Sequence, residues 1–498
     1  MDEIAFGLSS LSIRDIAAVA AGARVVLDRE ALEGMRETQA LIADAISRGT
    51  PIYGLTTGIG DLYSVALTPD EIRQTQLKML RSHASGVGLP LDQANVRAIM
   101  ATMIRSMMIG ASGVSPELVE TIAAMLNHGV TPRAPVGGSV GYLIATAHIG
   151  LAIFGYGEAW FEGELLSGAK ALTRAGIAVR EPGPREGHAL ISGTYEITGM
   201  GALALSRCED LVGIADLAGA MSIEAMKGNT RGYDPRLHRF RPHTGQVETA
   251  SRLLALLDGS EILEKYRDHR LQDALSLRCI PQVHGAVRDT IRHCRQVFDV
   301  EINSLTDNPV FVIEDGELVA LPGGNGHGAP VAMALDMLAI AIASLSTISQ
   351  ARSDRLVSAH LSGLPAFLSA GGGSSAFSIS PCVAAALSAD NRALAAPSTV
   401  HTMSTVAGQE DHVSMGVAAA RKAQSAVSNL IDILSVELLC AAQALDFHRP
   451  LKAGRATGAA RDLIRTVVPF REGDKEMYPD LAAVRSLFEN GRLCEVAS

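Results

Sequence analysis

The sequence predicts a mainly α-helical protein with a central bundle of long helices and a smaller, loop-rich N-terminal region. Residues 329–355 are apolar on nearly all sides, which is typical of a helix inside a bundle. Residues 414–446 repeat apolar side chains at spacings of three and four, over what would be roughly 45–50 Å of helix. Segments with strand-like patterns are few. A helix as long as 414–446 usually packs against partners, including other subunits.

The N-terminal region alternates predicted helices with glycine-rich loops. Thr68-Pro69-Asp70-Glu71 combines a capping box with proline at the first helical position, so a helix begins there and carries His83 near its end. A short hairpin is predicted around 162–164, and 228–247 is expected to be a polar loop. Further helices are predicted at 12–23, 30–47, 92–108 and 116–127. We divide the chain into an N-terminal region, the long-helix bundle and a tail of short helices, at 1–200, 201–450 and 451–498.

Composition excludes several classes of partner. The 43 Lys and Arg against 53 Asp and Glu give a net charge of −10, and no basic run is long enough to follow a nucleic-acid backbone. No stretch reaches 18 uninterrupted apolar residues, and the N-terminus carries acids where a secretory signal would carry lysines. Six scattered cysteines without C-x-x-C spacing fit free thiols in a reducing compartment. We expect a cytoplasmic protein that binds no metal and no membrane.

The rest of the chain is organised around residues 135–158. Gly137, Gly138, Ser139 and Gly141 open directly into an apolar segment with His148 in its middle. Glycine at this density lets the backbone approach another group closely, although a crowded helix joint has the same pattern. Residues 137–141 also fit the G-x-S-x-G motif of serine hydrolases. That motif forms a nucleophile elbow only between a buried strand and a helix, and no parallel-sheet pattern precedes it here.

Five segments match one family in order and at suitable distances. They are YGLTTGIG at 53–60, SHASGVG at 82–88, GSVG with AH at 147–148, QDALSLRCIPQVHGA at 272–286 with EINSLTDNP at 301–309, and QEDHVSM at 409–415. Together they resemble the histidine and aromatic amino-acid ammonia-lyases and the related aminomutases, and most of all the histidine branch. The resemblance spans nearly the whole chain. It implies a mostly α-helical fold, a small-molecule substrate, and a homotetramer whose active sites each draw on three subunits.

The resemblance also implies roles for individual residues. Tyr53 matches the catalytic base on a mobile loop, and Arg278 matches the clamp for the substrate carboxylate, a role that suits its planar fork of donors. His83 and Glu410 match residues that the histidine branch uses at the substrate side chain. Taken singly, each of these could be a satisfied structural group. The remaining substrate-binding positions are Gln272, Ser192, Asn303, Tyr142, Leu275 and Gly326.

The chain departs from the family pattern at the position of the prosthetic group. In the family, GSVG is followed by Ala-Ser-Gly, which cyclises into the electrophilic methylideneimidazolone ring. Here Gly141 is followed directly by Tyr142, three residues short, and Ala111-Ser112-Gly113 lies at a joint between predicted helices. Three neighbours of the ring are altered as well, because the family has asparagine, tyrosine and phenylalanine where this chain has Ser192, Leu275 and Gly326.

From this departure we predict a lyase-like enzyme with no cofactor. Positioned acid–base groups typically contribute about 10²–10⁴-fold, which is too little for deamination of histidine. The expected reaction is an easier elimination, a conjugate addition or cyclisation, or an isomerisation, on a small carboxylate that is derived from an amino acid. Two alternatives remain open. One is an ordinary ring-dependent lyase or aminomutase whose matured triad is not written in the sequence, and the other is a non-catalytic homologue that partners an active lyase.

Overall fold

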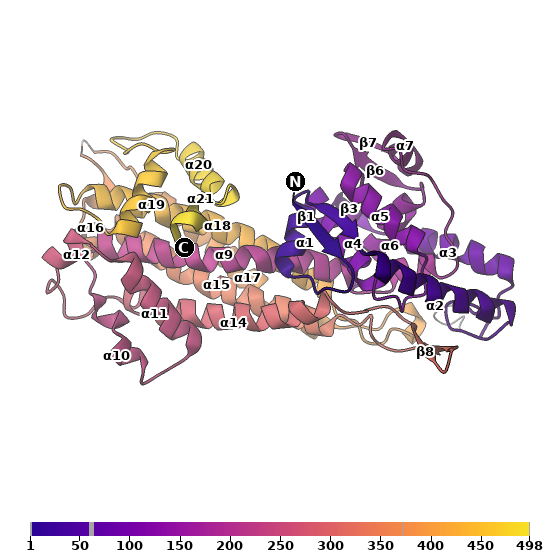
Figure 1. The fold of residues 1–498 in the computed structure, drawn as a ribbon. Helices are drawn as coiled ribbons and strands as arrows, with labels where there is room; N and C mark the ends of the chain where they lie inside the picture. Colours follow the sequence, from indigo (N-terminus) through magenta and orange to yellow (C-terminus); the bar gives the residue numbers. More distant parts are fainter. Residues whose placement is uncertain (1, 59–63, 372, 498) are drawn as a thin grey trace. The chain divides into compact units, whose positions relative to one another are not determined.

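The computed structural model describes residues 2–58, 64–371 and 373–497, and it is mainly helical, as predicted (Figure 1). It divides into two compact units. The first comprises 1–206, 294–336 and 397–421, and the second comprises 207–293, 337–396 and 422–498. These units follow contacts in space and therefore interleave along the sequence. The division at 200 and 450 remains a prediction.

Helix starts in the first unit follow local capping chemistry. Ser12 and Asp15 form a capping box at α1, and Thr68 and Glu71 form the predicted one at α3. Each pair satisfies backbone N–H groups that have no partner within the helix. The helices are α1 (Ile13–Ala20), α2 (Arg29–Ser47), α3 (Pro69–His83), α4 (Gln93–Met107), α5 (Pro116–His128), α6 (Ile144–Ile153), α7 (Gly168–Arg174) and α8 (Glu186–Ile191).

Short strands tie these helices together. β1 (Glu3–Phe6) and β2 (Arg24–Leu27) form a parallel pair. Two antiparallel pairs are formed by β3 (Val87–Pro90) with β5 (Pro135–Gly137) and by β8 (Val310–Glu314) with β9 (Glu317–Leu321). An antiparallel sheet of three strands contains β4 (Thr131–Pro132), β6 (Glu158–Phe161) and β7 (Glu164–Ser167), in that order. The predicted hairpin is confirmed, because Phe161 pairs with Glu164. The pairing of Val87 with Gly137 has a functional consequence, since it joins the segment after His83 to the glycine-rich turn.

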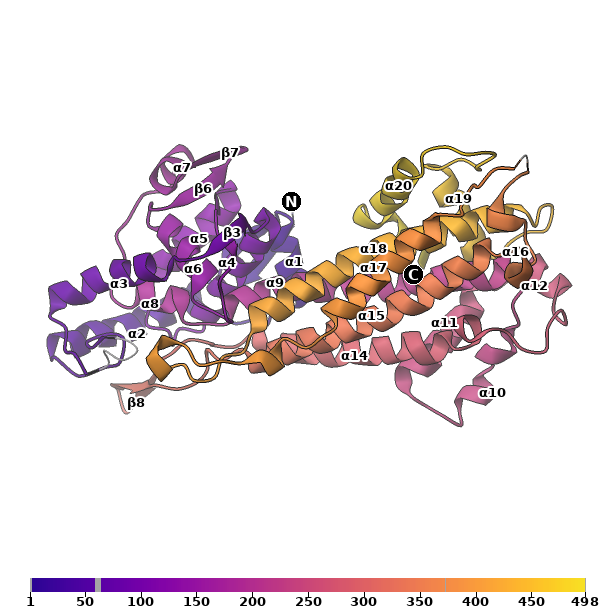
Figure 2. The ribbon, with the colours of Figure 1, turned by 180° about the vertical axis from the view of Figure 1, so that it is seen from behind.

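The long helices form the bundle (Figure 2). The helices predicted at 329–355 and 414–446 are confirmed as α15 (Ala329–Val357) and α18 (Gly416–Asp446). In the second unit, Asn391 of α17 donates both to the Ser346 hydroxyl of α15 and to the Ala426 carbonyl of α18, which fixes the three helices against one another. The other long helices are α9 (Tyr195–Ala225), α14 (Ile280–Glu301) and α17 (Ser380–Leu394).

The rest of the second unit consists of short helices. The prediction of a polar loop at 228–247 is wrong in part, because the chain there forms η2 and α10 and begins α11. Asn229 and Asp234 cap η2 and α10 with their side chains, which sequence periodicity does not reveal. These elements are η2 (Thr230–Tyr233), α10 (Pro235–His238), α11 (Thr244–Leu256), α12 (Glu261–Lys265), α13 (Leu275–Arg278), α16 (Ala359–Ser362), α19 (Arg455–Arg465), α20 (Tyr478–Glu489) and α21 (Arg492–Ala497).

Among the described residues, α15 and α18 are long and apolar enough to cross a membrane by length and composition. In their most apolar windows, however, 72% and 78% of the residues are buried inside the structure. Burial of this extent is what the core helices of a bundle show, because a helix enclosed by other helices is apolar all round.

Candidate functional site

Tyr53 lies in a tight turn that follows α2. The Thr56 hydroxyl accepts the Ile52 N–H at 2.7 Å and donates to the Thr50 carbonyl at 2.6 Å, so the turn is closed by hydrogen bonds. The Tyr53 ring meets the His188 ring edge-on, with centroids 6.0 Å apart and an interplanar angle of 71°. Ile59 and Gly60, which end the YGLTTGIG motif, lie outside the described residues.

His83 is the last residue of α3 and is half-buried. Its Nδ1 lies 2.9 Å from the Met79 carbonyl and 3.0 Å from the Ser82 hydroxyl. A carbonyl only accepts, so this contact requires the proton on Nδ1. In the uncharged form of the ring, Nε2 is then left as an acceptor. The α3 helix, which carries His83, packs against α8, which carries His188, and the charge of His83 lowers the pKa of His188.

Tyr142 and Glu410 are joined directly. The Tyr142 hydroxyl donates to Glu410 Oε1 at 2.8 Å, and the Thr405 hydroxyl donates to Oε2 at 3.2 Å. Burial raises the pKa of Tyr142, and the hydrogen bond and charge of Glu410 and the charge of Tyr53 raise it further. Tyr142 therefore stays protonated and serves as a donor. The structure thus brings Tyr53, Tyr142 and Glu410 together.

The glycine-rich turn is fixed from two sides. The Ser139 hydroxyl donates to the Tyr142 carbonyl at 3.1 Å, and the Val140 carbonyl accepts the Met415 N–H at 2.7 Å. Leu143, the residue before α6, has a φ of +79° and makes no side-chain cap. A leucine in this conformation stores roughly 1–3 kcal/mol of strain, which persists only where the surroundings enforce it.

Glu196, near the start of α9, lies beneath this turn. Its side chain is 1% exposed, and burial raises its pKa to about 7. The neighbouring Ser139 side chain, a hydrogen bond from the Ala145 backbone and the charge of Arg421 act in the opposite direction. The Glu196 carboxylate thereby accepts a hydrogen bond from the Ala145 N–H in the first turn of α6. Leu143, the residue before α6, provides no side-chain cap there. The prediction from sequence missed Glu196, although a carboxylate inside an apolar helix start is the kind of signal that could have found it.

Three other predicted site residues of the first unit lie on segments other than those of Tyr53, Tyr142 and Glu410. The Ser192 hydroxyl donates to the Asn308 carbonyl at 3.3 Å, and Gly326 lies in the loop before α15. Asn303 is fully engaged. Its amide nitrogen donates to the carbonyls of Leu11 and Asp299, and its oxygen accepts from the Leu11 N–H and from Arg105. All four hydrogen-bonding positions of the Asn303 amide are therefore used within the fold.

Arg278, Gln272 and Leu275 belong to the second unit. Arg278 and Gln272 line one cleft of about 350 Å³. Arg278 Nη1 donates to the Asp273 carbonyl at 2.7 Å, which leaves part of its guanidinium fork for a ligand. Leu275 begins α13 and is 62% exposed. A guanidinium on the wall of a cleft is suited to binding a carboxylate.

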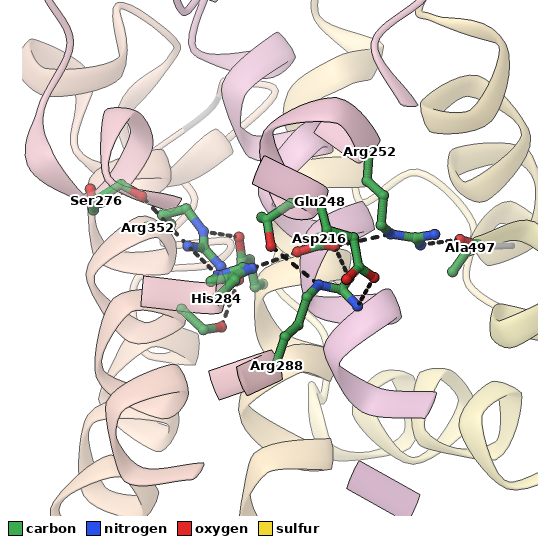
Figure 3. Close-up of polar contacts among 11 residues, drawn as sticks. Asp216, Glu248, Arg252, Ser276, His284, Arg288, Arg352 and Ala497 are labelled. Atoms are coloured by element: carbon green, nitrogen blue, oxygen red, sulfur yellow. Dashed lines mark hydrogen bonds and ion pairs between the residues drawn. The ribbon is translucent and has the colours of Figure 1, made fainter. Parts of the chain in front are cut away.

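A buried polar network in the second unit supports α13 (Figure 3). Arg352 donates to Glu437 at 2.5 Å and to the Ser276 carbonyl of α13 at 3.5 Å. His284 lies 3.4 Å from Arg352 through Nε2 and 2.8 Å from Asp216 through Nδ1. Both members of the Arg352–Glu437 pair are fully buried. The network continues from Asp216 to Arg252 and Arg288, and from Arg288 to Glu248.

The structure shows what Ala111-Ser112-Gly113 does. Ser112 is fully buried with no hydrogen-bond partner for its hydroxyl among the described residues, and a side chain on Gly113 would collide with Ile42. The Ala111 carbonyl accepts the Phe311 N–H at 2.9 Å. This triplet is a packing joint, as predicted. A second Ala-Ser-Gly occurs at 84–86, where the Gly86 N–H donates to His148 at 3.2 Å.

Comparisons with known proteins agree with the fold and the motifs. The model of the aromatic amino acid lyase family matches residues 11–466. A histidine ammonia-lyase from Symbiobacterium thermophilum is 42% identical over 99% of this chain and 98% of its own. The crystal structure of histidine ammonia-lyase from Trypanosoma cruzi superposes with a TM-score of 0.92 at 35% identity, over 99% of this chain and 95% of that one.

Two further crystal structures are similar. Tyrosine aminomutase from Streptomyces globisporus matches with a TM-score of 0.94 at 32% identity, over 99% of this chain and 98% of its own. The ergothioneine-degrading enzyme ergothionase from Treponema denticola, in complex with desmethyl-ergothioneine sulfonic acid, matches with a TM-score of 0.91 at 29% identity, over 99% of both chains.

These relatives overturn the expectation that the enzyme has no cofactor. Relatives about 42% identical are histidine ammonia-lyases, and they indicate the family's methylideneimidazolone group. In the sequence Gly141 is followed directly by Tyr142, with no triad between them, and the Tyr142 hydroxyl donates to Glu410. We therefore derive no chemical step through the ring. From the family match over most of its length and the identity to its relatives, the chain belongs to the aromatic amino acid lyase family.

Proposed function

We propose that the protein catalyses elimination of the amino group from an α-amino acid with an imidazole or similarly polar ring. The observation that carries this proposal is the grouping of Tyr53, His83 and Glu410 in the first unit. Tyr53 contacts His188 and acts electrostatically on Tyr142, which is bonded to Glu410, and His83 lies close to His188. The relatives named histidine ammonia-lyase support the same reaction.

Each residue has a distinct role in this proposal. Tyr53 removes the proton from the β-carbon of the substrate, the Cα–N bond breaks to release ammonia, and a double bond forms between the α- and β-carbons. Glu410 accepts a hydrogen bond from the substrate ring. His83, with the Nδ1 proton held by Met79, presents Nε2 toward that ring. Arg278 belongs to the second unit, and in this proposal the guanidinium that binds the carboxylate comes from another subunit. These groups orient the substrate, and such positioning lowers the barrier by arranging the reacting atoms in advance.

We further propose a cytoplasmic homotetramer in which residues of several subunits complete each site. Exposed apolar side chains on α15 support assembly. Met333, Met337 and Ile340 recur at spacings of four and three and are 52%, 39% and 49% exposed. An apolar helix face of this kind is normally covered by a partner. Six cysteines, all free in the structure, are consistent with a reducing compartment.

Substrate turnover tests the proposal directly. Purified protein is incubated with L-histidine, L-tyrosine and L-phenylalanine, and released ammonia and the unsaturated acid are quantified. We expect L-histidine to be turned over most efficiently. A protein that releases ammonia from none of the three does not carry out the proposed reaction.

A second candidate substrate is ergothioneine. The similarity to ergothionase, at 29% identity over the whole chain, favours including it in the same panel. Faster elimination from ergothioneine than from L-histidine would replace the first candidate with the second.

The family's ring is tested by mass. The relatives favour the ordinary ring-dependent reaction, so the tryptic peptide spanning 134–170 is expected to exceed the mass of its printed residues by that of one ring. A peptide whose measured mass equals the mass calculated from its sequence would contradict ring dependence.

A further inference from the structure

His188 is a buried imidazole in the candidate site to which neither the motifs nor the comparisons give a role. It lies in the middle of α8 and is 5% exposed. Its backbone N–H donates to Gln76 Oε1 at 3.1 Å, and Gln76 is itself fully buried. The ring contacts Tyr53 edge-on. The backbone of His188 is therefore held firmly while its ring lies beside the proposed catalytic base.

The surroundings of His188 keep its ring uncharged. Burial lowers the pKa of His188 well below its ordinary value, the charge of Arg185 lowers it further, and the hydrogen bond to the Gly54 backbone opposes both. A backbone hydrogen bond raises the pKa of a histidine when a carbonyl accepts the ring N–H. One ring nitrogen of His188 therefore donates its proton to the Gly54 carbonyl. Nδ1 has no partner among the described residues. It is therefore the nitrogen that bears the lone pair.

A buried lone pair without a partner is rare in folded proteins, and it marks a place where a ligand or water supplies a donor. An uncharged imidazole acceptor selects an N–H or O–H group. In the proposed reaction, the substrate carboxylate is bound by Arg278 of another subunit, and the substrate ring is bound by His83 and Glu410. The donor that remains without a partner is the α-ammonium group.

The position of His188 and the uncharged state of its ring both suit binding of the α-ammonium group. The α-carbon, which carries the ammonium group, is bonded to the β-carbon from which Tyr53 takes the proton. A side chain in contact with Tyr53 is therefore placed near the amino nitrogen. An uncharged ring accepts a hydrogen bond from a cation without repelling it, whereas a protonated imidazole would repel it.

We propose that His188 binds the α-ammonium group of the substrate through Nδ1 and so distinguishes amino acids from their deaminated analogues. The proposal rests on the proposed function, because it assumes that the bound molecule is an α-amino acid. It assigns His188 a role in substrate specificity that is separate from proton removal by Tyr53.

Calorimetric binding tests the assignment without turnover. In a Tyr53→Phe background, L-histidine and 3-(imidazol-4-yl)propanoate, its deaminated counterpart, are titrated into protein with His188, His188→Leu or His188→Asn. We expect His188→Leu to weaken L-histidine binding about 10-fold or more, since a hydrogen bond to a charged group is lost. Binding of the propanoate should change less than about twofold, because it has no ammonium group. Asparagine, which keeps an acceptor, should restore most of the affinity for L-histidine.

Controls separate a binding role from a packing role. Thermal unfolding verifies that each variant is folded, and His148→Leu removes another imidazole of the same unit, which accepts the Gly86 N–H. This control should not discriminate between the two ligands. Equal weakening of both ligands by His188→Leu, or no weakening, would overturn the assignment. Binding of L-histidine without release of ammonia by the unmutated protein would overturn the proposed function only, and binding of neither ligand would overturn both.

Discussion

The Tyr142 hydroxyl donates to Glu410 at 2.8 Å and joins two segments that are 268 residues apart in the chain. One segment is the glycine-rich turn and the other is the loop before α18. Tyr142→Phe should lower the free energy of unfolding by about 1–2 kcal/mol, because a hydrogen bond to a carboxylate in a partly buried position is lost. Urea unfolding measures the change. Thr405→Val, which removes the longer bond to the same carboxylate, should have a smaller effect. An unchanged midpoint for Tyr142→Phe would show that the bond contributes nothing.

Removal of the Tyr53 hydroxyl should abolish most activity without affecting the fold. Tyr53→Phe is expected to lower kcat by about 10²–10⁴-fold, the usual contribution of a positioned acid–base group. The melting temperature should stay within a few degrees of the original. Tyr156→Phe removes the hydroxyl of a half-buried tyrosine that donates to Glu181, and it should leave kcat unchanged. Full activity of Tyr53→Phe would rule out Tyr53 as the base.

Glu196 should make stability depend on pH in the slightly acid range. Burial raises its pKa from 4.5 to about 7 in the folded protein, so the folded state binds the proton more tightly than the unfolded state. The contribution of Glu196 to the free energy of unfolding is fully present below about pH 4.5 and is lost as the pH rises through about 7. The loss lowers the free energy of unfolding by roughly 3 kcal/mol. Arg421 is the charged group that acts on Glu196 in this environment. Glu196→Gln should flatten this part of the stability curve, as followed by chemical unfolding between pH 4.5 and 8. A curve of unchanged slope would contradict the assignment.

The Arg352–Glu437 pair should respond very differently to single and double replacement. Arg352→Met leaves Glu437 buried and unpaired, which typically costs about 3–5 kcal/mol. Arg352→Met combined with Glu437→Met removes both charges and should recover much of that loss. Because Arg352 also donates to the Ser276 carbonyl, the double variant should still raise KM through displacement of Arg278. Calorimetry and steady-state kinetics measure the two effects. A double variant as unstable as the single one would indicate that the charges are not coupled.

Gly113 should tolerate no side chain. Gly113→Ala combines a φ of +73° with a collision against Ile42 and close contact with Phe311, and we expect a loss of about 2–4 kcal/mol. Gly176→Ala is a matched control, because Gly176 has a φ of +72° and no neighbour within 4 Å of the added carbon. It should cost only about 1–2 kcal/mol, the strain of the left-handed backbone. Similar losses for both variants would show that packing at Gly113 is unimportant.

Features encoded by neighbouring residues could be predicted from the sequence. The capping box at Thr68 and the long helices α15 and α18 depend on local chemistry and periodicity, and the structure confirms them. The fold class follows from the same patterns, because helices that are apolar all round require a bundle. The roles assigned to Tyr53, His83, Glu410 and Arg278 stay predictions, although three of these residues lie in one group.

Features that depend on contacts between distant segments could not be predicted. The perturbed pKa values of His188 and Glu196 arise from burial, and hydrogen bonds with Gly54, Ser139 and Ala145 oppose the shifts. Asn303 belongs to a motif that suggests substrate binding, but Leu11 and Arg105 use its amide. Burial and partnership emerge only when the chain folds, so no spacing rule reports them.

Four long helices, α9, α14, α15 and α18, contribute residues to both compact units. Four of the five boundaries between the units therefore fall inside a helix, and the fifth, between 396 and 397, follows α17. Neither unit can serve as an independent cassette for gene fusion or for recombination with a relative. Exchange of segments within this family has to replace whole helices, and chimaeras that join two parents within a helix are expected to accumulate as insoluble protein.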